Sequence, residues 1–459
     1  MSVLTDLPML LKRGIRRYKV PGAALAVHRR GRLYETAAGV VNLETRVPTT
    51  ADTVFQIGSI TKIFTTSLIM QLADRGRLDL DAPVVDVLPD FRTADRAAAR
   101  RVTVRQLLTH TSGIEGDFFV DAGRGDDNIR RLQDMGTLLP SLFPPGERLS
   151  YCNFGFAMLG RITEVLTGMT WDQAMRRRLF RPLGMTHALT LPEETLRYRA
   201  AIGHVPNPKK PGEQMLSPMP WLSLGQKAAG ATPAMSAADL LKFAVMHVDR
   251  GVSKAGERIL SRSAVRDMQR VQFKLPRHFA GGLDAWGLGW MLMRWSGKRV
   301  IGHDGGTVGQ YAFLRIVPDD DLAIALLTNG GDARGLYDEL MAVLLQSLAR
   351  IELPALPAID EALTERLAGA LDRYVGRYVN IAGSTEVSAQ GGRLFVESTP
   401  SEIGGMILPK TPLAFVDRNT VRMASGDPIT DRNLLLFQDA GDSPARYLQF
   451  GARLSRRSA

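Results

Sequence analysis

A buried helix that begins near Ser59 is the feature of this sequence that most constrains its fold. Gly58 permits a tight entry into the helix. Apolar residues then recur at helical spacing, at Ile63, Leu68, Ile69 and Leu72. The pattern predicts a helix over residues 59–75 that is buried inside a domain.

The same helix carries a hydroxyl and an amine three residues apart, Ser59 and Lys62. Residues i and i+3 share one face of a helix, so Lys62 can point at the Ser59 hydroxyl. The positive end of the helix dipole favours a developing alkoxide at Ser59. A lysine acts as a base only when neutral, and lowering its pKa from about 10.4 to near 7 requires burial and a second cation. The pair predicts a nucleophile with its own base.

The composition is that of an ordinary globular protein with room for more than one domain. The 459 residues are 45% hydrophobic and 23% charged. The net charge of +11 raises the question of nucleic acid or an anionic membrane surface, but the basic residues are spread in short groups, such as 29–30, 176–178 and 456–457. These groups are typical of solvated faces, so neither a nucleic-acid nor a membrane partner is expected.

Cys152 is the only cysteine, which excludes an intrachain disulfide and a multi-cysteine metal site. The first residues place Asp6 and Pro8 before a short apolar patch and the basic residues after it, the reverse of a secretory signal. The apolar stretches are shorter than a membrane span. A cytoplasmic location is therefore expected, and the sequence leaves the oligomeric state open.

Helical and strand-like segments alternate along the first 350 residues. A helix is expected over 4–17 and a β-hairpin over 22–27 and 33–41. Further helices are expected at 104–110, 154–166, 171–179, 237–248 and 336–349. An antiparallel meander is expected at 299–302, 310–317 and 322–328, with turns at 304–306 and 318–321.

Residues 352–358 contain two prolines and little periodicity, which predicts a linker. The predicted organisation is therefore a domain over 1–351, this linker, and a β domain over 359–459. After a short helix, the last domain has strand-like pieces at 374–379, 393–397, 413–416, 434–437 and 446–450. It either covers a sheet edge or shapes a substrate site.

Two further motifs follow Ser59 and Lys62 along the chain. Tyr151 and Asn153 lie on a loop that enters a helix, where a phenol can shuttle a proton if a nearby cation lowers its pKa, and an amide can hold a peptide carbonyl. His303 ends a strand and is followed by Gly305 and Gly306, which would let a substrate backbone lie against the strand. A backbone N–H there, with that of Ser59, would form an oxyanion hole.

Together, Ser59-x-x-Lys62, Tyr151-x-Asn153 and His303-x-Gly305 resemble the three motifs of the penicillin-recognising serine enzymes. Supporting phrases at 107–113, 143–146, 182–185 and 286–290 look like the branch that contains class C β-lactamases, D-aminopeptidases, D,D-peptidases and esterases. The resemblance covers about residues 8–350. It implies an α/β (α+β) fold of the β-lactamase/transpeptidase type, with an antiparallel sheet flanked by helices, a helical subdomain, and the active site between them. The C-terminal segment resembles penicillin-binding-protein-type thioesterases, so a small lipocalin-like β-barrel is expected there.

The resemblance also implies roles for these residues. Ser59 is the acylated nucleophile, Lys62 accepts its proton, and Tyr151 relays protons to the leaving group and to water. Asn153 orients the substrate amide, and the N–H groups of Ser59 and Gly306 stabilise the oxyanion. Class C β-lactamases have lysine where this chain has His303, a departure that argues against lactamase activity and is similar to esterases and D-amino-acid peptidases. A mostly neutral histidine is expected to recognise a lactam carboxylate poorly.

Other candidate residues favour structural roles. His110 is expected in a turn rather than as a base, because no Gly-x-Ser-x-Gly elbow accompanies it. Asp304 is expected to cap a turn, and Cys152 to be a small buried thiol. The remaining histidines lack metal-ligand spacing, so neither a metal nor another cofactor is expected.

The leading hypothesis is a serine hydrolase that forms an acyl-serine intermediate on an amide or ester, such as a D-residue-containing peptide or a small ester. A second hypothesis is acyl transfer to an amine, including peptide cyclisation, in which Arg446 or Arg453 binds a substrate carboxylate. A third is a catalytically silent protein that binds a ligand in the cleft. In each case the partner is a small molecule or a peptide.

Overall fold

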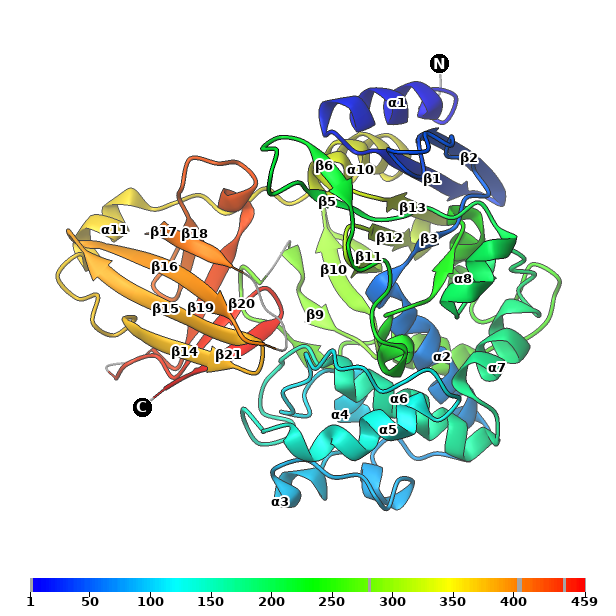
Figure 1. Ribbon diagram of the computed structural model, residues 1–459, viewed down its shortest axis with the longest axis horizontal. Helices are drawn as coiled ribbons and strands as arrows, with labels where there is room; N and C mark the ends of the chain where they lie inside the picture. The colour runs from blue at the N-terminus through cyan, green and yellow to red at the C-terminus, as the bar shows by residue number, and fades with distance from the viewer. Residues whose placement is uncertain (1–2, 280–281, 403–406, 441–442, 459) are drawn as a thin grey trace.

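The computed structural model describes residues 3–279, 282–402, 407–440 and 443–458. Within them the chain forms a large part, in which a sheet lies among helices, and a β-barrel beside it (Figure 1). The prediction of an antiparallel sheet flanked by helices, followed by a small barrel, is confirmed.

The central sheet has eight antiparallel strands in the described residues, in the order β2-β1-β13-β12-β11-β10-β9-β8. Its N-terminal hairpin pairs with the last strand of the large part, for example Leu25 with Leu326. The two neighbouring strands β1 and β13 are rich in small and branched apolar residues and are almost wholly buried, as strands covered on both faces require. The strands are β1 (Gly22–Arg29), β2 (Arg32–Gly39), β8 (Phe273–Lys274), β9 (Ala285–Trp286), β10 (Met291–Trp295), β11 (Lys298–Gly306), β12 (Tyr311–Val317) and β13 (Leu322–Thr328).

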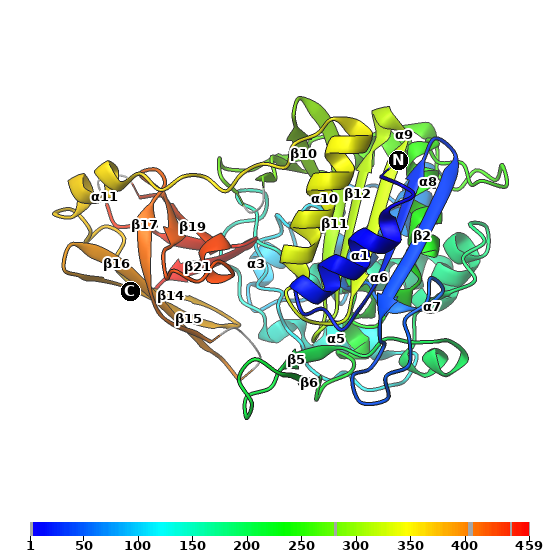
Figure 2. The ribbon, with the colours of Figure 1, turned by 90° about the horizontal axis from the view of Figure 1, so that it is seen from above.

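Helices cover both faces of this sheet. Figure 2 shows α1 (Leu7–Arg17) and α10 (Ala333–Ala349) side by side on one face, where they share a core with β1, β12 and β13. On the other face, α8 (Ala237–Val248) contacts β1 and β13. The apolar residues that continue across this second face belong to the larger core, which reaches into the helical region.

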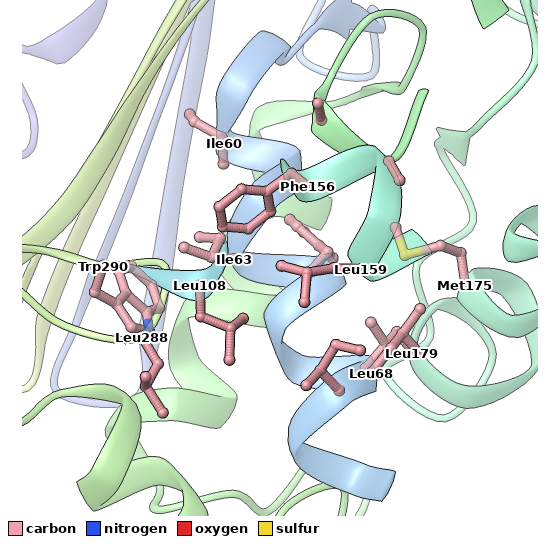
Figure 3. Packing of buried hydrophobic residues seen from close by; sticks show 14 of the residues in the cluster. Ile60, Ile63, Leu68, Leu108, Phe156, Leu159, Met175, Leu179, Leu288 and Trp290 are labelled. Carbon is pink, nitrogen blue, oxygen red and sulfur yellow. The ribbon is translucent and has the colours of Figure 1, made fainter. Parts of the chain in front are cut away.

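The helix that carries Lys62, α2 (Thr61–Asp74), lies in the middle of that larger core. Its residues are buried from Thr61 to Leu72, so the helix is covered around its whole circumference, as a central helix must be. Figure 3 shows Ile63 and Leu68 of this helix packed among Leu159, Leu179 and Trp290 from other segments. The predicted buried helix is confirmed.

The remaining helices of the large part are α3 (Arg96–Ala99), α4 (Val104–Leu108), α5 (Asn128–Asp134), α6 (Asn153–Thr167), α7 (Trp171–Met175) and α9 (Arg262–Met268). Of these, α6, α7 and α9 contact α2, and α4 and α5 contact α6. Short 3-10 segments lie at Gly58–Ile60, Val84–Asp86, Met135–Leu138, Pro192–Arg197, Leu224–Ala229 and Pro318–Asp320. Small strands pair as β3 (Phe55–Gln56), β7 (Ala234–Met235) and β4 (Ala188–Leu189), and as β5 (His204–Pro206) with β6 (Gln214–Leu216).

The C-terminal strands β14 to β21 close into a barrel around an apolar interior. The Tyr374 ring packs there at a tilt against two others, with its centroid 5.2 Å from that of Phe415 and 4.9 Å from that of Phe437. The strands are β14 (Gly376–Asn380), β15 (Gly383–Gln390), β16 (Arg393–Pro400), β17 (Leu408–Phe415), β18 (Thr420–Met423), β19 (Leu434–Gln438), β20 (Tyr447–Phe450) and β21 (Arg453–Arg457), with α11 (Glu361–Leu367) before them and a 3-10 turn at Thr430–Arg432.

Several predicted elements need correction. The turn predicted at 304–306 is wrong, because β11 continues to Gly306 and pairs with β12 there. The helix predicted over 171–179 ends at Met175 and becomes a π-helical turn, Arg176–Phe180. In the barrel, β15, β18 and β21 were not predicted, since each is short or rich in Gly, Ser, Thr and Arg and lacks an apolar run.

The segment between α10 and α11 has no helix or strand in residues 351–360. The exact division of the chain at 351 and 358 stays a prediction. The barrel nevertheless contacts the large part directly: Arg148 binds Asp439, Arg432 binds Asp332, and the Glu115 carboxylate accepts the Ile381 N–H. In the described part of the chain, none of the helices has the length and apolar character needed to cross a membrane.

Candidate functional site

Ser59 lies in the 3-10 turn that leads into α2, and Lys62 lies in the first turn of that helix. Gly58 has φ +50°, and a Cβ at its position would lie 2.5 Å from the backbone nitrogen of Gly306. Only glycine therefore fits this entry. The turn places the Ser59 hydroxyl oxygen 3.0 Å from Lys62 Nζ, within hydrogen-bond distance.

Lys62 is fully buried and makes two other hydrogen bonds. Its Nζ donates to Asn153 Oδ1 at 2.7 Å and to the Ala229 carbonyl at 2.6 Å. Burial lowers the pKa of Lys62 well below its ordinary value, whereas the charge of Asp117 works in the opposite direction. The amine thus has the environment that a neutral base requires.

Asn153 begins α6, and Tyr151 precedes it on the loop. Asn153 Nδ2 donates to Asp117 Oδ1 at 2.6 Å, which turns its carbonyl oxygen toward Lys62. The Tyr151 ring lies 4.7 Å from Lys62 Nζ and 5.1 Å from the Arg453 guanidinium carbon.

These neighbouring cations do not lower the pKa of Tyr151 below its ordinary value. Burial raises the pKa of this phenol well above its usual range, although a side-chain hydrogen bond with Ser59 and the charge of Arg453 oppose the shift. The phenol is therefore protonated at neutral pH and can donate a hydrogen bond. In the free enzyme, Tyr151 is therefore favoured as a proton donor rather than as a phenolate.

His303 lies on β11, buried between aromatic rings. Its centroid lies 5.9 Å from that of Trp286 and 6.4 Å from that of Tyr151. Its Nδ1 is 2.6 Å from the Asp304 carbonyl oxygen, which can only accept, so Nδ1 carries the proton. Burial, with the Lys62 charge, lowers the pKa of His303 to about 4. The imidazole is neutral at pH 7, in line with the mostly neutral histidine expected from the sequence.

The two glycines after His303 have different surroundings. A Cβ on Gly305 would overlap the Ile57 carbonyl and lie 3.0 Å from the Ser59 nitrogen, so this glycine lets β11 approach the start of α2. Gly306 lines the small cavity in front of Ser59. Gly305 therefore has a packing role, and the expectation that both glycines accommodate a substrate backbone stays a prediction.

The cavity in front of Ser59 has a volume of about 80 Å³. The backbones of Ser59 and Gly306 border it side by side, an arrangement suited to two N–H donors for one oxyanion. The residues that line it are Ser59, Phe119, Asn153, Leu222, Gln226, Ala229, Gly230, Ala231, Gly306 and Arg453.

The turn between β20 and β21 brings the barrel into this site. Arg453 forms an ion pair with Asp117, the Ala452 carbonyl accepts from the Tyr151 N–H at 2.8 Å, and the Leu454 N–H donates to Ser150 Oγ at 3.2 Å. Sequence reasoning missed Asp117 and Ala229, and it proposed Arg453 only as a binder of a substrate carboxylate. Asp117 closely follows residues 107–113, which resemble the family, and this position was the only sequence signal for it.

The other candidates occupy supporting positions. His110 has φ +58°, stacks on Tyr151 at 4.1 Å, and accepts from the Cys152 N–H at 3.0 Å, so it supports the Tyr151 loop. Cys152 is buried, as expected, and its sulfur accepts from the Gly155 N–H. Asp304 does not cap a turn, because it forms ion pairs with Arg315 and Arg334.

Arg446 is not among the residues that line the cavity; its guanidinium lies 5.7 Å from the Tyr447 ring. Among the residues that the structure describes, His, Cys, Asp and Glu side chains do not gather in a group of three or more that could hold a metal ion.

Comparison with known proteins places this arrangement in a family. Residues 9–346 match the family model described as Beta-lactamase. Penicillin-binding protein 4 of Amycolatopsis lactamdurans is 44% identical over 374 residues, which cover 78% of this chain and 95% of that protein. Esterase EstB of Burkholderia gladioli is 32% identical over 206 residues, or 40% of this chain and 50% of the esterase.

A solved structure resembles the whole chain, barrel included. The crystal structure of SurE with D-Leu has a TM-score of 0.77 and 30% sequence identity, and the match covers 99% of each chain. The family model, these relatives and the shared fold lead to one conclusion: this chain belongs to the β-lactamase family and is a serine hydrolase of that family.

Proposed function

We propose that the enzyme cleaves an amide or ester through an acyl-serine intermediate on Ser59. The observation that carries this proposal is the 3.0 Å hydrogen bond between Ser59 and the fully buried Lys62. Ser59 Oγ attacks the substrate carbonyl carbon as its proton passes to Lys62 Nζ. The negative charge that develops on the carbonyl oxygen is stabilised by the N–H groups of Ser59 and Gly306.

Collapse of this tetrahedral intermediate breaks the bond to the leaving group, which takes a proton from the Tyr151 hydroxyl. The proton on Lys62 then restores the phenol. In deacylation, water gives a proton to the relay formed by Lys62 and Tyr151 and attacks the acyl carbon. The bond to Ser59 Oγ then breaks, the acid leaves, and the proton returns to Ser59. Asn153 holds the substrate amide, and neutral His303 lies beside Tyr151.

The substrate that we favour is a peptide with a D-residue at the reacting position. Support comes from SurE with D-Leu, which resembles the whole chain, and from neutral His303, which provides no cation for a lactam carboxylate. A second cavity, of about 400 Å³, adjoins the site through Asp117, Phe119 and Arg453. Its walls also include hydroxyl and amide groups at one end of the barrel, suited to a peptide backbone: Asn380, Ser384, Thr385, Ser398, Thr399 and Asn433.

Ser384→Trp is expected to fill part of this second cavity. The kcat/KM for a tetrapeptide ester should fall about tenfold or more, because even a small misplacement of bound substrate slows the reaction, whereas p-nitrophenyl acetate hydrolysis should remain unchanged. Ser388→Trp is the matched control, since Ser388 lies on the same face of β15 and outside the cavity lining. Equal kcat/KM values for the tetrapeptide ester in the two variants would show that the substrate does not occupy the second cavity.

A second candidate function is transfer of the acyl group to an amine, including cyclisation. It is favoured by Arg453, which lies at the Ser59 cavity and could bind the carboxylate of an incoming amino acid in place of Asp117. Arg446 is not supported in this role. Hydrolysis and transfer share the acyl-enzyme and differ only in the group that attacks it.

The test is to incubate the protein with a fluorescent penicillin and with p-nitrophenyl acetate, then locate the adduct by intact mass and peptide mapping. Label on Ser59 is expected with at least one probe. Adding D-leucine or another amine to the acyl-enzyme then separates the two functions: an amide product indicates transfer, and free acid alone indicates hydrolysis. A folded protein without an adduct from either probe would contradict the acyl-serine proposal and favour a silent ligand-binding protein.

A further inference from the structure

A continuous chain of contacts runs from the barrel to Lys62. Arg453 at the start of β21 forms an ion pair with Asp117, Asp117 Oδ1 accepts from Asn153 Nδ2 at 2.6 Å, and Asn153 Oδ1 accepts from Lys62 Nζ at 2.7 Å. An amide that donates through nitrogen and accepts through oxygen can satisfy both neighbours in one orientation only. Asp117 therefore determines which way Asn153 faces.

The charges along this chain alternate in sign. The Asp117 side chain is 14% exposed, so little solvent screens its carboxylate from Lys62. Its negative charge favours protonated Lys62, and the positive charge of Arg453 opposes it. Other titratable groups around Lys62 are Tyr151, under its Nζ, and Cys152, His303 and His110, which interact with its charge.

We propose that Arg453 and Asp117 are positioning residues for Lys62: Asp117 orients Asn153, and the barrel arginine offsets the Asp117 charge so that Lys62 can act as a neutral amine. The barrel thus completes the catalytic machinery of the large part. This inference rests on the proposed function, in which Lys62 accepts the proton of Ser59.

The test measures the pH dependence of acylation by p-nitrophenyl acetate, a substrate without a carboxylate for Arg453 to bind. Rising pH deprotonates Lys62, so kcat/KM rises along an acid limb that reports this amine in the free enzyme. In Arg453→Gln the limb should move to higher pH by about one unit, because Asp117 is left without its partner. In Asp117→Asn, whose amide oxygen can still accept from Asn153, the limb should move to lower pH.

Matched variants separate this effect from loss of barrel docking. Arg453→Lys keeps the charge and should restore the limb, and the double variant Asp117→Asn/Arg453→Gln should return it close to its original position. Arg432→Gln removes another ion pair between the barrel and the large part, with Asp332, and should leave the limb in place. The Arg453 side chain is 45% exposed, so its replacement leaves no hole in a core.

An unmoved limb in Arg453→Gln, or an equal loss of rate at every pH in both single variants, would overturn the proposal. A limb shift in Arg432→Gln would also overturn it. These outcomes are distinct from failure of the proposed function, in which Ser59→Ala would keep its activity whatever the position of the limb.

Discussion

Ser59→Ala is expected to abolish the covalent adduct and to lower kcat by at least about 10⁴-fold, the scale seen when a nucleophile is removed from a serine enzyme. The reason is chemical, because the attacking oxygen is lost while the neighbouring backbone donors remain. Intact mass spectrometry after incubation with p-nitrophenyl acetate or a fluorescent penicillin measures the adduct, and initial rates measure the activity.

Ser112→Ala is the control for this experiment. Ser112 is also buried, lies close to His110 in the chain, and could serve as an alternative nucleophile. Its hydroxyl is 3.4 Å from the Ile114 N–H, which indicates a role in the turn. Full labelling of Ser112→Ala and none of Ser59→Ala would identify the nucleophile; the reverse pattern would refute the assignment of Ser59.

Lys62→Met should lower the acylation rate by about 10²–10⁴-fold, the contribution of a positioned general base. The side chain keeps a similar length but loses the amine that accepts the Ser59 proton. Stopped-flow measurement of the acylation burst, with excess substrate, separates this step from deacylation.

The same variant should lose thermal stability. The methionine side chain cannot donate to Asn153 Oδ1 or to the Ala229 carbonyl, so two buried acceptors lose their donor. A lower thermal midpoint would therefore accompany the loss of rate. If folded Lys62→Met were acylated at the wild-type rate, another group would have to be the base, and Tyr151 is the nearest candidate.

Much of the site was predictable because its candidate catalytic residues lie close together in the sequence, in pairs. Ser59 and Lys62 share a helix turn, Tyr151 and Asn153 are two residues apart, and His303 and Gly305 lie on one strand, so each pair is positioned by local geometry. The buried helix after Ser59 was predictable for the same reason, since its apolar residues recur at helical spacing.

The barrel was predictable only in part. Strands with apolar runs, such as β19, were found, whereas β15 and β21 carry polar or charged residues at most positions and gain their structure from the neighbours that pair with them. The same limit applies to the turn expected at 304–306. Pairing with β12, together with the close approach of Gly305 to the start of α2, keeps this segment extended.

The order and spacing of its residues predicted a candidate nucleophile and base and a β domain at the end of the chain. The resemblance of its motifs to a known family implied the family and the barrel. The fold was needed to bring Arg453 to Asp117, 336 residues earlier in the chain, and through Asn153 to Lys62. Periodicity and motifs report neighbours within a few residues of each other. The contact between Arg453 of the barrel and Asp117 of the large part depends on how the barrel docks. A local sequence pattern carries no information about that docking.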